Sequence, residues 1–175
     1  MTDLRYPIGE FKFEGSLAGD ARRRAVDDIE AAPARLRAAV QGLSAPQLDM
    51  PYRPCGWTVR QVVHHVPDSH LNAYTRFKLA LTENEPTIKP YDEARWAELA
   101  DVRQAPLEVS LALLEALHIR WVLLLRSLGA EEFARRLRHP ERGVMTLDEA
   151  LGYYAWHGRH HIAHITSLRE RMGWR

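Results

Sequence analysis

The sequence predicts an all-α four-helix bundle, and three observations support that prediction. Four long segments repeat apolar residues at spacings of three and four, which is the pattern of a helix with one buried face. Loops that contain proline and glycine separate these segments. No segment has the strong alternation of apolar and polar residues that indicates a half-buried strand. Four such helices can bury their apolar faces against one another in a bundle.

An extended arm is expected to precede the first long helix. Residues 1–16 contain Pro7 and Gly9 and show no helical period, so they are expected to lie extended. Apolar residues recur at helical spacing over 17–43, which predicts the first helix. Pro33 falls inside this segment, and because proline removes a helical hydrogen bond, a kink or a split is expected there.

The second long helix is expected over residues 58–83. Thr58 and Gln61 match a capping box, in which each side chain satisfies a free backbone N–H at the start of a helix. Pro67 lies inside this helix and is expected to interrupt and bend it. The chain before it is expected to be a loop, with a short capped turn at residues 44–46.

Two more long helices are expected in the second half of the chain. Residues 84–91 are expected to form a loop, and residues 92–100 a short helix. The third long helix is predicted over 106–128, and a polar connector over 129–143 leads to the last helix at 146–172. The connection between the second and third helices is longer than an up-down hairpin needs, so the sequence leaves the topology open.

Length and composition restrict the class of protein. A chain of 175 residues predicts one domain, residues 1–175, with an ordinary globular composition of 46% hydrophobic and 27% charged residues. A net charge of +1 argues against a dedicated nucleic-acid binder. The longest apolar run, residues 121–125, is too short to span a membrane. With a single cysteine and no apolar leader segment, a cytoplasmic protein is expected.

Histidine is the unusual residue of this chain. Four of the nine histidines fall within eight residues near the C-terminus. Because a helix turns about 100° per residue, residues four apart lie on one face. His161 lies on the apolar stripe of the last helix with His157 beside it, whereas His160 and His164 form a second pair nearer the rim. Two imidazoles at this spacing can bind one metal ion, so His157 and His161 are the first candidate ligands.

A third ligand is needed, because a catalytic metal site usually has three protein ligands and an open position. The candidates are the histidines of the second helix, His64, His65 and His70. His70 falls within the apolar stripe, but Pro67 disturbs the helical period, so spacing alone does not choose among them. A single histidine is more often a surface or hydrogen-bonded residue than a ligand.

Two segments of the chain resemble the DinB/YfiT-like metalloproteins, and most closely their YfiT branch. They are residues 57–65 (WTVRQVVHH) and residues 157–164 (HGRHHIAH). Together with shorter supporting segments, the resemblance covers nearly the whole chain; these segments are 6–10, 51–53, 76–79, 89–93, 118–121 and 171–174. The resemblance implies a four-helix bundle that holds one divalent metal ion, zinc or nickel, with three histidines.

The resemblance also implies which histidines these are. One ligand of the family lies eight residues after the tryptophan that opens the second helix, which here is His65 after Trp57. The other two form a pair four residues apart on the last helix, here His157 and His161. Pro67 departs from the family pattern, in which a small helix former is expected at that position.

The YfiT branch resembles thiol S-transferases of the bacillithiol type. The resemblance therefore implies a detoxifying enzyme that uses a low-molecular-weight thiol as cosubstrate. This enzyme would join the thiol to an electrophilic small molecule. It also implies a homodimer. Two alternatives stay open: a metal-dependent hydrolase that uses a metal-activated water molecule, and a non-catalytic bundle whose metal site is closed by a fourth ligand, Cys55 or His164.

Several polar residues are candidates for further roles at this site. His64, Arg159 and His160 are neighbours of the implied ligands in the sequence and are expected to support them or to contact substrate. Asp68 and Asp92 are the carboxylates suggested as general bases, although no spacing argument favours either.

Overall fold

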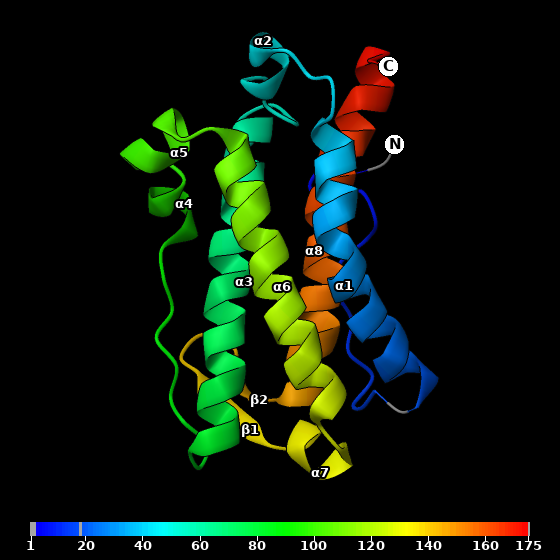
Figure 1. The fold of residues 1–175 in the computed structure, drawn as a ribbon, viewed down its shortest axis with the longest axis vertical. Coiled ribbons are helices and arrows are strands. Elements are labelled where there is room, and N and C mark those ends of the chain that lie inside the picture. Colours follow the sequence, from blue (N-terminus) through cyan, green and yellow to red (C-terminus); the bar gives the residue numbers. More distant parts are fainter. Residues whose placement is uncertain (1–2, 18, 175) are drawn as a thin grey trace.

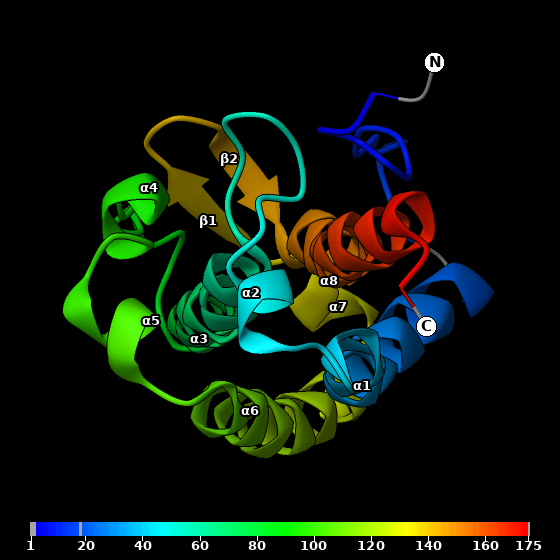
Figure 2. The same cartoon turned by 90° about the horizontal axis from the view of Figure 1, so that it is seen from above.

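Four long helices lie side by side in the computed structural model, which describes residues 3–17 and 19–174 (Figure 1). They are α1 (Asp20–Val40), α3 (Val59–Thr82), α6 (Leu107–Ser127) and α8 (Leu147–Met172). Helix α1 packs against α6 and α8, and α3 packs against the same two helices, so the order around the bundle is α1–α6–α3–α8 (Figure 2). The predicted four-helix bundle is confirmed.

The two prolines inside helices do not break them. Helix α3 runs without interruption from Val59 to Thr82 through Pro67, and α1 runs through Pro33. The interruption expected at Pro67 and the split named as one possibility at Pro33 were therefore wrong. Pro67 is buried among the packed helices, and tertiary packing of this kind outweighs the loss of one backbone hydrogen bond.

Side-chain caps fix the first turns of α3 and α8. The Thr58 side chain accepts a hydrogen bond from the backbone N–H of Gln61, and the side-chain oxygen of Gln61 in turn accepts a bond from the Thr58 N–H. Thr146 accepts a bond from the N–H of Glu149 at the start of α8. Gly173 ends α8 with a φ of 66°, a left-handed conformation that favours glycine.

The connections contain more structure than expected. Short helices occur at α2 (Ala45–Leu48), α4 (Glu93–Trp96), α5 (Ala100–Gln104) and α7 (Ala130–Phe133). The polar connector also contains an antiparallel hairpin, with β1 (Arg136–His139) paired to β2 (Gly143–Thr146). This hairpin was not predicted, because the sequence shows no strong strand alternation there. Each strand has only four residues, which is too short for alternation to stand out in the sequence.

The apolar core of the bundle is divided in two by a layer of buried histidines. One cluster includes Phe77 and Trp121 near the end that holds the hairpin, and the other includes Leu36 and Leu114 nearer α2. The histidines between them along the helices are His70, His118 and His157. These imidazoles are polar groups in an apolar setting, so their hydrogen bonds matter.

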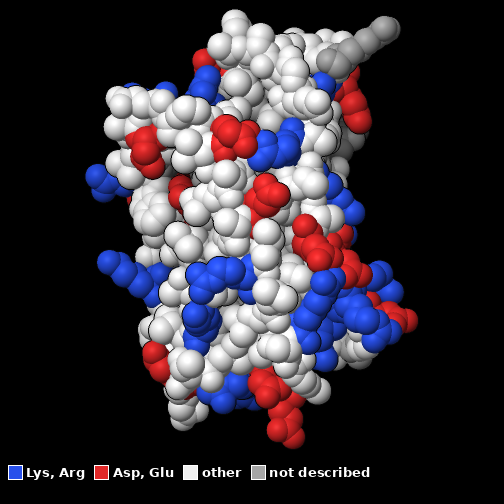
Figure 3. Space-filling view, in the orientation of Figure 1, with Lys and Arg blue, Asp and Glu red and all other residues white. Residues whose placement is uncertain are grey.

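Ion pairs join neighbouring helices on the surface. Arg126 lies 2.7 Å from Glu30, and Arg37 lies 2.6 Å from Glu108, so α6 is linked to α1 at two points. Acidic and basic side chains are interspersed on the face that includes these helices (Figure 3). Exposed pairs of this kind contribute about 0–1 kcal/mol each. Within the described residues, the helices lack the combination of length and hydropathy needed to cross a bilayer.

Candidate metal centre

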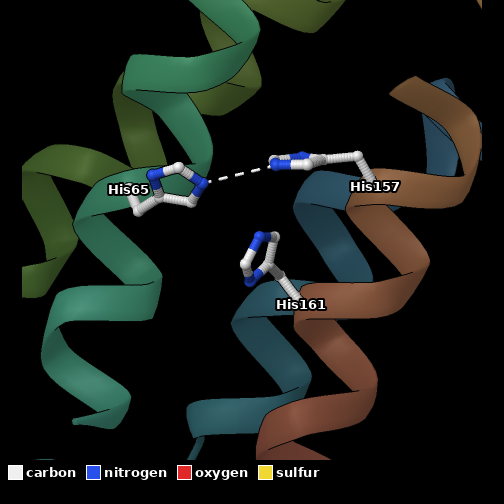
Figure 4. A group of neighbouring side chains, drawn as sticks. All are labelled: His65, His157 and His161. Atoms are coloured by element: carbon white, nitrogen blue, oxygen red, sulfur yellow. Dashed lines mark hydrogen bonds between the residues drawn. The ribbon is translucent and has the colours of Figure 1, made fainter. Parts of the chain in front are cut away.

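Three histidines from two helices converge between α3 and α8. One ring nitrogen from each of His65, His157 and His161 lies within 4.8 Å of the others, and all three residues are buried. The Nε2 atoms of His65 and His157 are 3.3 Å apart. Figure 4 shows the three rings turned toward a common space, with His65 on one helix facing the pair on the other. These are the three residues that the resemblance implied as ligands, and the structure brings them together.

The local sequence explains why the rings meet. His157 and His161 lie one turn apart on α8, so both project from the same face of that helix. His65 lies in the second turn of α3, whose first residue is set by the Thr58 cap. The indole of Trp57 packs beside His65 and His161, with ring centres 4.6 and 6.3 Å away.

Burial keeps these imidazoles neutral. Desolvation lowers the pKa of His65 to about 4, with a smaller contribution from His164. Desolvation also holds the pKa values of His157 and His161 well below the ordinary value, and the neighbouring histidines act in the same direction. Neutral imidazole is the form that binds a metal ion, so at pH 7 the three rings need lose no proton to act as ligands.

The donor set fits a divalent transition metal. Each ring offers a neutral nitrogen, and imidazole nitrogens suit zinc, copper, iron and nickel. Three ligands leave at least one coordination position open, as in catalytic rather than structural sites. His65, His157 and His161 would therefore hold such an ion.

Two of the residues suggested as supporting groups lie elsewhere. The Nδ1 atom of His64 lies 2.7 Å from the hydroxyl of Ser110 on α6. Arg159 is half exposed and lies 3.4 Å from Asp28 on α1. Neither residue lines the cavity beside the three histidines, because each projects from another face of its helix. Their supporting roles stay predictions.

The second histidine pair of α8 has two different environments. His160 lines the cavity and stacks on Trp156, with ring centres 4.3 Å apart. His164 stacks on Tyr52 at 3.9 Å, and its Nε2 atom donates a hydrogen bond to the carbonyl of Arg5 over 3.0 Å. His164 thus fastens the N-terminal arm to α8. Neither histidine belongs to the converging group, and neither does the exposed Cys55.

The three histidines open into a cavity of about 530 Å³. Its lining residues come from α3, α8, the hairpin, the N-terminal arm and the segment before α4. Figure 2 shows where these elements lie around the bundle. Aromatic side chains supply much of the surface, and they include Tyr6, Phe11, Trp57, Tyr91, Tyr153 and Trp156. A cavity of this size can bury a small organic molecule.

Charged groups in the cavity wall differ from those suggested by the sequence. Asp68 and Asp92 are absent from the wall, and Asp92 caps α4 by accepting a bond from the Arg95 N–H, so the structure gives neither residue support as a general base. The charged residues that line the cavity are Glu10, Arg76, Glu93, Glu141 and Arg142. Their spacing in the chain gave no signal, because arm, helix and loops meet only in the folded molecule.

Relatives of this chain match it over nearly its full length. A protein of Bacillus mycoides (strain KBAB4), described as a "putative metal-dependent hydrolase", is 55% identical over 174 residues, which are 99% of this chain and 100% of the relative. A protein of Bacillus cereus (strain 03BB102) with the same description is 56% identical over 174 residues, with the same coverage.

Solved structures agree with the fold. YfiT from Bacillus subtilis, described as "a probable metal-dependent hydrolase with an unusual four-helix bundle topology", matches with a TM-score of 0.96 at 52% identity, over 98% of this chain and 99% of that one. A second four-helix bundle protein, 22% identical, matches with a TM-score of 0.56 over 81% of this chain and 94% of its own, and supports the fold alone. The DinB superfamily model matches residues 28–165. The chain therefore belongs to the DinB superfamily.

Proposed function

We propose that this protein is a metal-dependent enzyme that joins a low-molecular-weight thiol to an electrophilic small molecule. His65, His157 and His161 hold the metal ion, and the adjoining cavity holds the two reactants. A bound divalent ion lowers the pKa of a thiol or of a water molecule held against it, so that either can act as a nucleophile near pH 7.

One observation carries this proposal: three neutral imidazoles converge at the wall of a cavity. Neutral ligands leave the full charge of the ion available to a bound reactant, whereas carboxylate or thiolate ligands would reduce it. Among the residues that the structure describes, the group formed by His65, His157 and His161 contains no acidic or thiol side chain. The open position of a three-ligand site faces the cavity in which a reactant can bind.

A thiol needs less help than water at such a site. An ordinary thiol has a pKa of about 8.5, so a nearby cation is enough to ionise most of it at neutral pH. Water usually needs a positioned base to accept its proton as well. No hydrogen bond joins a carboxylate to His65, His157 or His161 within the described part of the chain. This difference favours the thiol as nucleophile.

The chain's own residues would then bind and orient the electrophile. The aromatic wall, with Trp57 and Trp156 beside the histidines, excludes water from the reacting atoms. Arg76 and Arg142 donate hydrogen bonds to the hydroxyls of Tyr154 and Tyr153, which fixes these phenols at the wall. Holding both reactants in one small cavity replaces a collision between free molecules.

A hydrolase with the same metal site is the second candidate. The descriptions of the relatives from Bacillus mycoides and Bacillus subtilis favour it, because both name a metal-dependent hydrolase. Glu10, Glu93 and Glu141 lie in the cavity wall, and a carboxylate there could take up the proton of an attacking water molecule.

A substrate panel separates the two candidates. Zinc-loaded and nickel-loaded protein is assayed with an aryl halide and an epoxide, with and without a low-molecular-weight thiol, and with a chromogenic ester in the absence of thiol. Turnover that requires thiol supports the transferase; turnover of the ester alone supports the hydrolase and contradicts the first proposal.

Matched variants show whether either activity depends on the three-histidine site. His161→Ala should abolish turnover and metal binding together. His164→Ala removes a buried imidazole from the same helix. The His164 ring stacks on Tyr52, bonds to the Arg5 carbonyl and lies edge-on to His161 with ring centres 5.3 Å apart, but it is not one of the three converging histidines. We expect this variant to retain both. Full activity of metal-free His161→Ala would contradict both candidates, and metal binding without turnover of any compound would favour a non-catalytic bundle.

A further inference from the structure

A line of hydrogen bonds runs from His157 through the core to the backbone of α1. The Nδ1 atom of His157 lies 3.1 Å from Nε2 of His70, and the Nδ1 atom of His70 lies 2.8 Å from Nε2 of His118. At the far end, Nδ1 of His118 lies 2.5 Å from the carbonyl oxygen of Ile29. The line therefore crosses from α8 through α3 and α6 to α1.

The carbonyl at the end of the line fixes the position of every proton along it. A carbonyl oxygen only accepts hydrogen bonds, so Nδ1 of His118 must carry a proton. A neutral imidazole has one N–H and one lone pair, so Nε2 of His118 accepts a bond from Nδ1–H of His70. By the same argument, Nε2 of His70 accepts a bond from Nδ1–H of His157.

The rings in this line are deeply buried, which favours the neutral form of imidazole. His70 is 0% exposed, His118 is 2% exposed and His157 is 5% exposed. If every hydrogen bond in the line ran in the opposite direction, Nδ1 of His118 would have to accept a bond from a carbonyl oxygen. A carbonyl oxygen has no hydrogen to donate.

We infer that His70 and His118 are positioning residues that hold His157 in the tautomer whose Nε2 lone pair faces the metal site. With its proton on Nδ1, His157 presents an unprotonated Nε2 to the space shared with His65 and His161, 3.3 Å from Nε2 of His65. A ligand histidine that is hydrogen-bonded in this way is oriented before the metal arrives. This inference rests on the metal site proposed above.

The tautomer gives the first test. Long-range ¹H–¹⁵N NMR spectra of the metal-free full-length protein distinguish Nδ1–H from Nε2–H histidine. We expect His157, His70 and His118 all to be Nδ1–H tautomers, whereas free imidazole side chains in water favour the other form. A His157 ring that carries its proton on Nε2 would overturn the inference.

Zinc affinity gives the second test, measured by competition with a chromogenic chelator. His118→Leu removes a side chain that is two hydrogen bonds away from His157, yet it should weaken Zn²⁺ binding, because His70 and His157 are then free to exchange tautomers. His70→Leu should weaken it as well. The expected loss is about 10–100-fold, the range for residues that orient a metal ligand.

Two further variants separate positioning from packing. His70→Gln keeps an acceptor and a donor on one side chain and should restore much of the affinity lost in His70→Leu. Trp121→Phe perturbs the aromatic ring that packs edge-on against both His70 and His118, with ring centres 5.7 and 5.8 Å away, but it leaves the hydrogen bonds intact. It should lower the melting temperature and leave Zn²⁺ affinity within about twofold, well below the 10–100-fold loss of an orienting residue.

The outcomes are distinguishable from failure of the metal site itself. If the wild type binds no Zn²⁺, the site proposed above is wrong. If the wild type binds Zn²⁺ and folded His70→Leu and His118→Leu bind it equally well, the site stands and the positioning role is wrong. An equal loss in Trp121→Phe and His118→Leu would also contradict the inference, because packing alone would then account for both.

Discussion

His157 has a different role on each side of its ring. Its Nε2 atom faces His65 and lies 3.5 Å from the Ser69 hydroxyl, whereas Nδ1 faces His70 inside the core. One side chain thus joins the wall of the cavity to the interior of the bundle. A substitution there is expected to affect metal binding and core packing together.

The buried histidines of α3 show why spacing could not select a ligand from the sequence. His64 faces Ser110 on α6, His65 faces the α8 histidines, and His70 bonds to both α8 and α6. All three are buried because α3 packs between two helices. An apolar stripe identifies a buried face, but here it does not tell which neighbour that face meets. His65 could be chosen only through the resemblance.

Asp68 provides a prediction at the residue scale. Burial raises its pKa to about 6, with a smaller contribution from Asp101. Because folding favours the protonated form of Asp68, the contribution of this residue to the free energy of unfolding falls as pH rises from about 4 through 6. At pH 8 the ionised carboxylate therefore lowers the stability of the folded protein. Asp68→Asn should therefore be at least as stable as the wild type at pH 8 by urea denaturation, and its turnover should be unchanged. A tenfold loss of turnover would show that Asp68 serves the reaction.

Helix α3 shows at the element scale how local signals and packing compete. The Thr58 capping box predicted its first turn correctly, because that signal depends on residues within one turn. Pro67 predicted a break that did not occur, because the helix is buried on both sides of it. The β1–β2 hairpin was missed for a related reason: its strands are short and are held by contacts with distant residues, such as the bond from the Ile88 N–H to the Arg138 carbonyl.

Removal of the α3 cap tests the contribution of that element. Thr58→Ala leaves the backbone N–H of Gln61 without its side-chain acceptor and should lower the free energy of unfolding by about 1 kcal/mol in urea. Thr75→Ala makes the same chemical change at an exposed position in the middle of α3 and serves as the control, with no loss expected. Equal effects of the two substitutions would show that the cap contributes nothing.

The buried histidines affect the stability of the whole molecule through their titration. His118 and His65 have pKa values of about 4 in the folded chain, and an unfolded histidine has a pKa near 6.5. Between these values the unfolded chain binds more protons, so the free energy of unfolding of the metal-free protein must fall as pH is lowered. Each such histidine can remove about 3 kcal/mol between pH 6.5 and 4.

Urea denaturation of the metal-free protein from pH 7.5 down to pH 5 measures this effect. We expect stability to be constant above about pH 7 and to fall steeply below 6.5, where histidines of the unfolded chain become protonated. His118→Leu removes one of these groups, so its stability should depend less on pH, by up to about 1.4 kcal/mol per pH unit. An identical pH dependence in the two proteins would show that His118 is protonated in the folded state.

Metal content of the purified protein tests the central claim most directly. Elemental mass spectrometry is applied to the wild type, to His157→Ala and to His164→Ala after incubation with Zn²⁺ and removal of free ion. The wild type and His164→Ala should each retain one equivalent of zinc, and His157→Ala should retain little. A wild type without metal, or a His157→Ala variant that retains as much zinc as the wild type, would contradict a metal site at His65, His157 and His161.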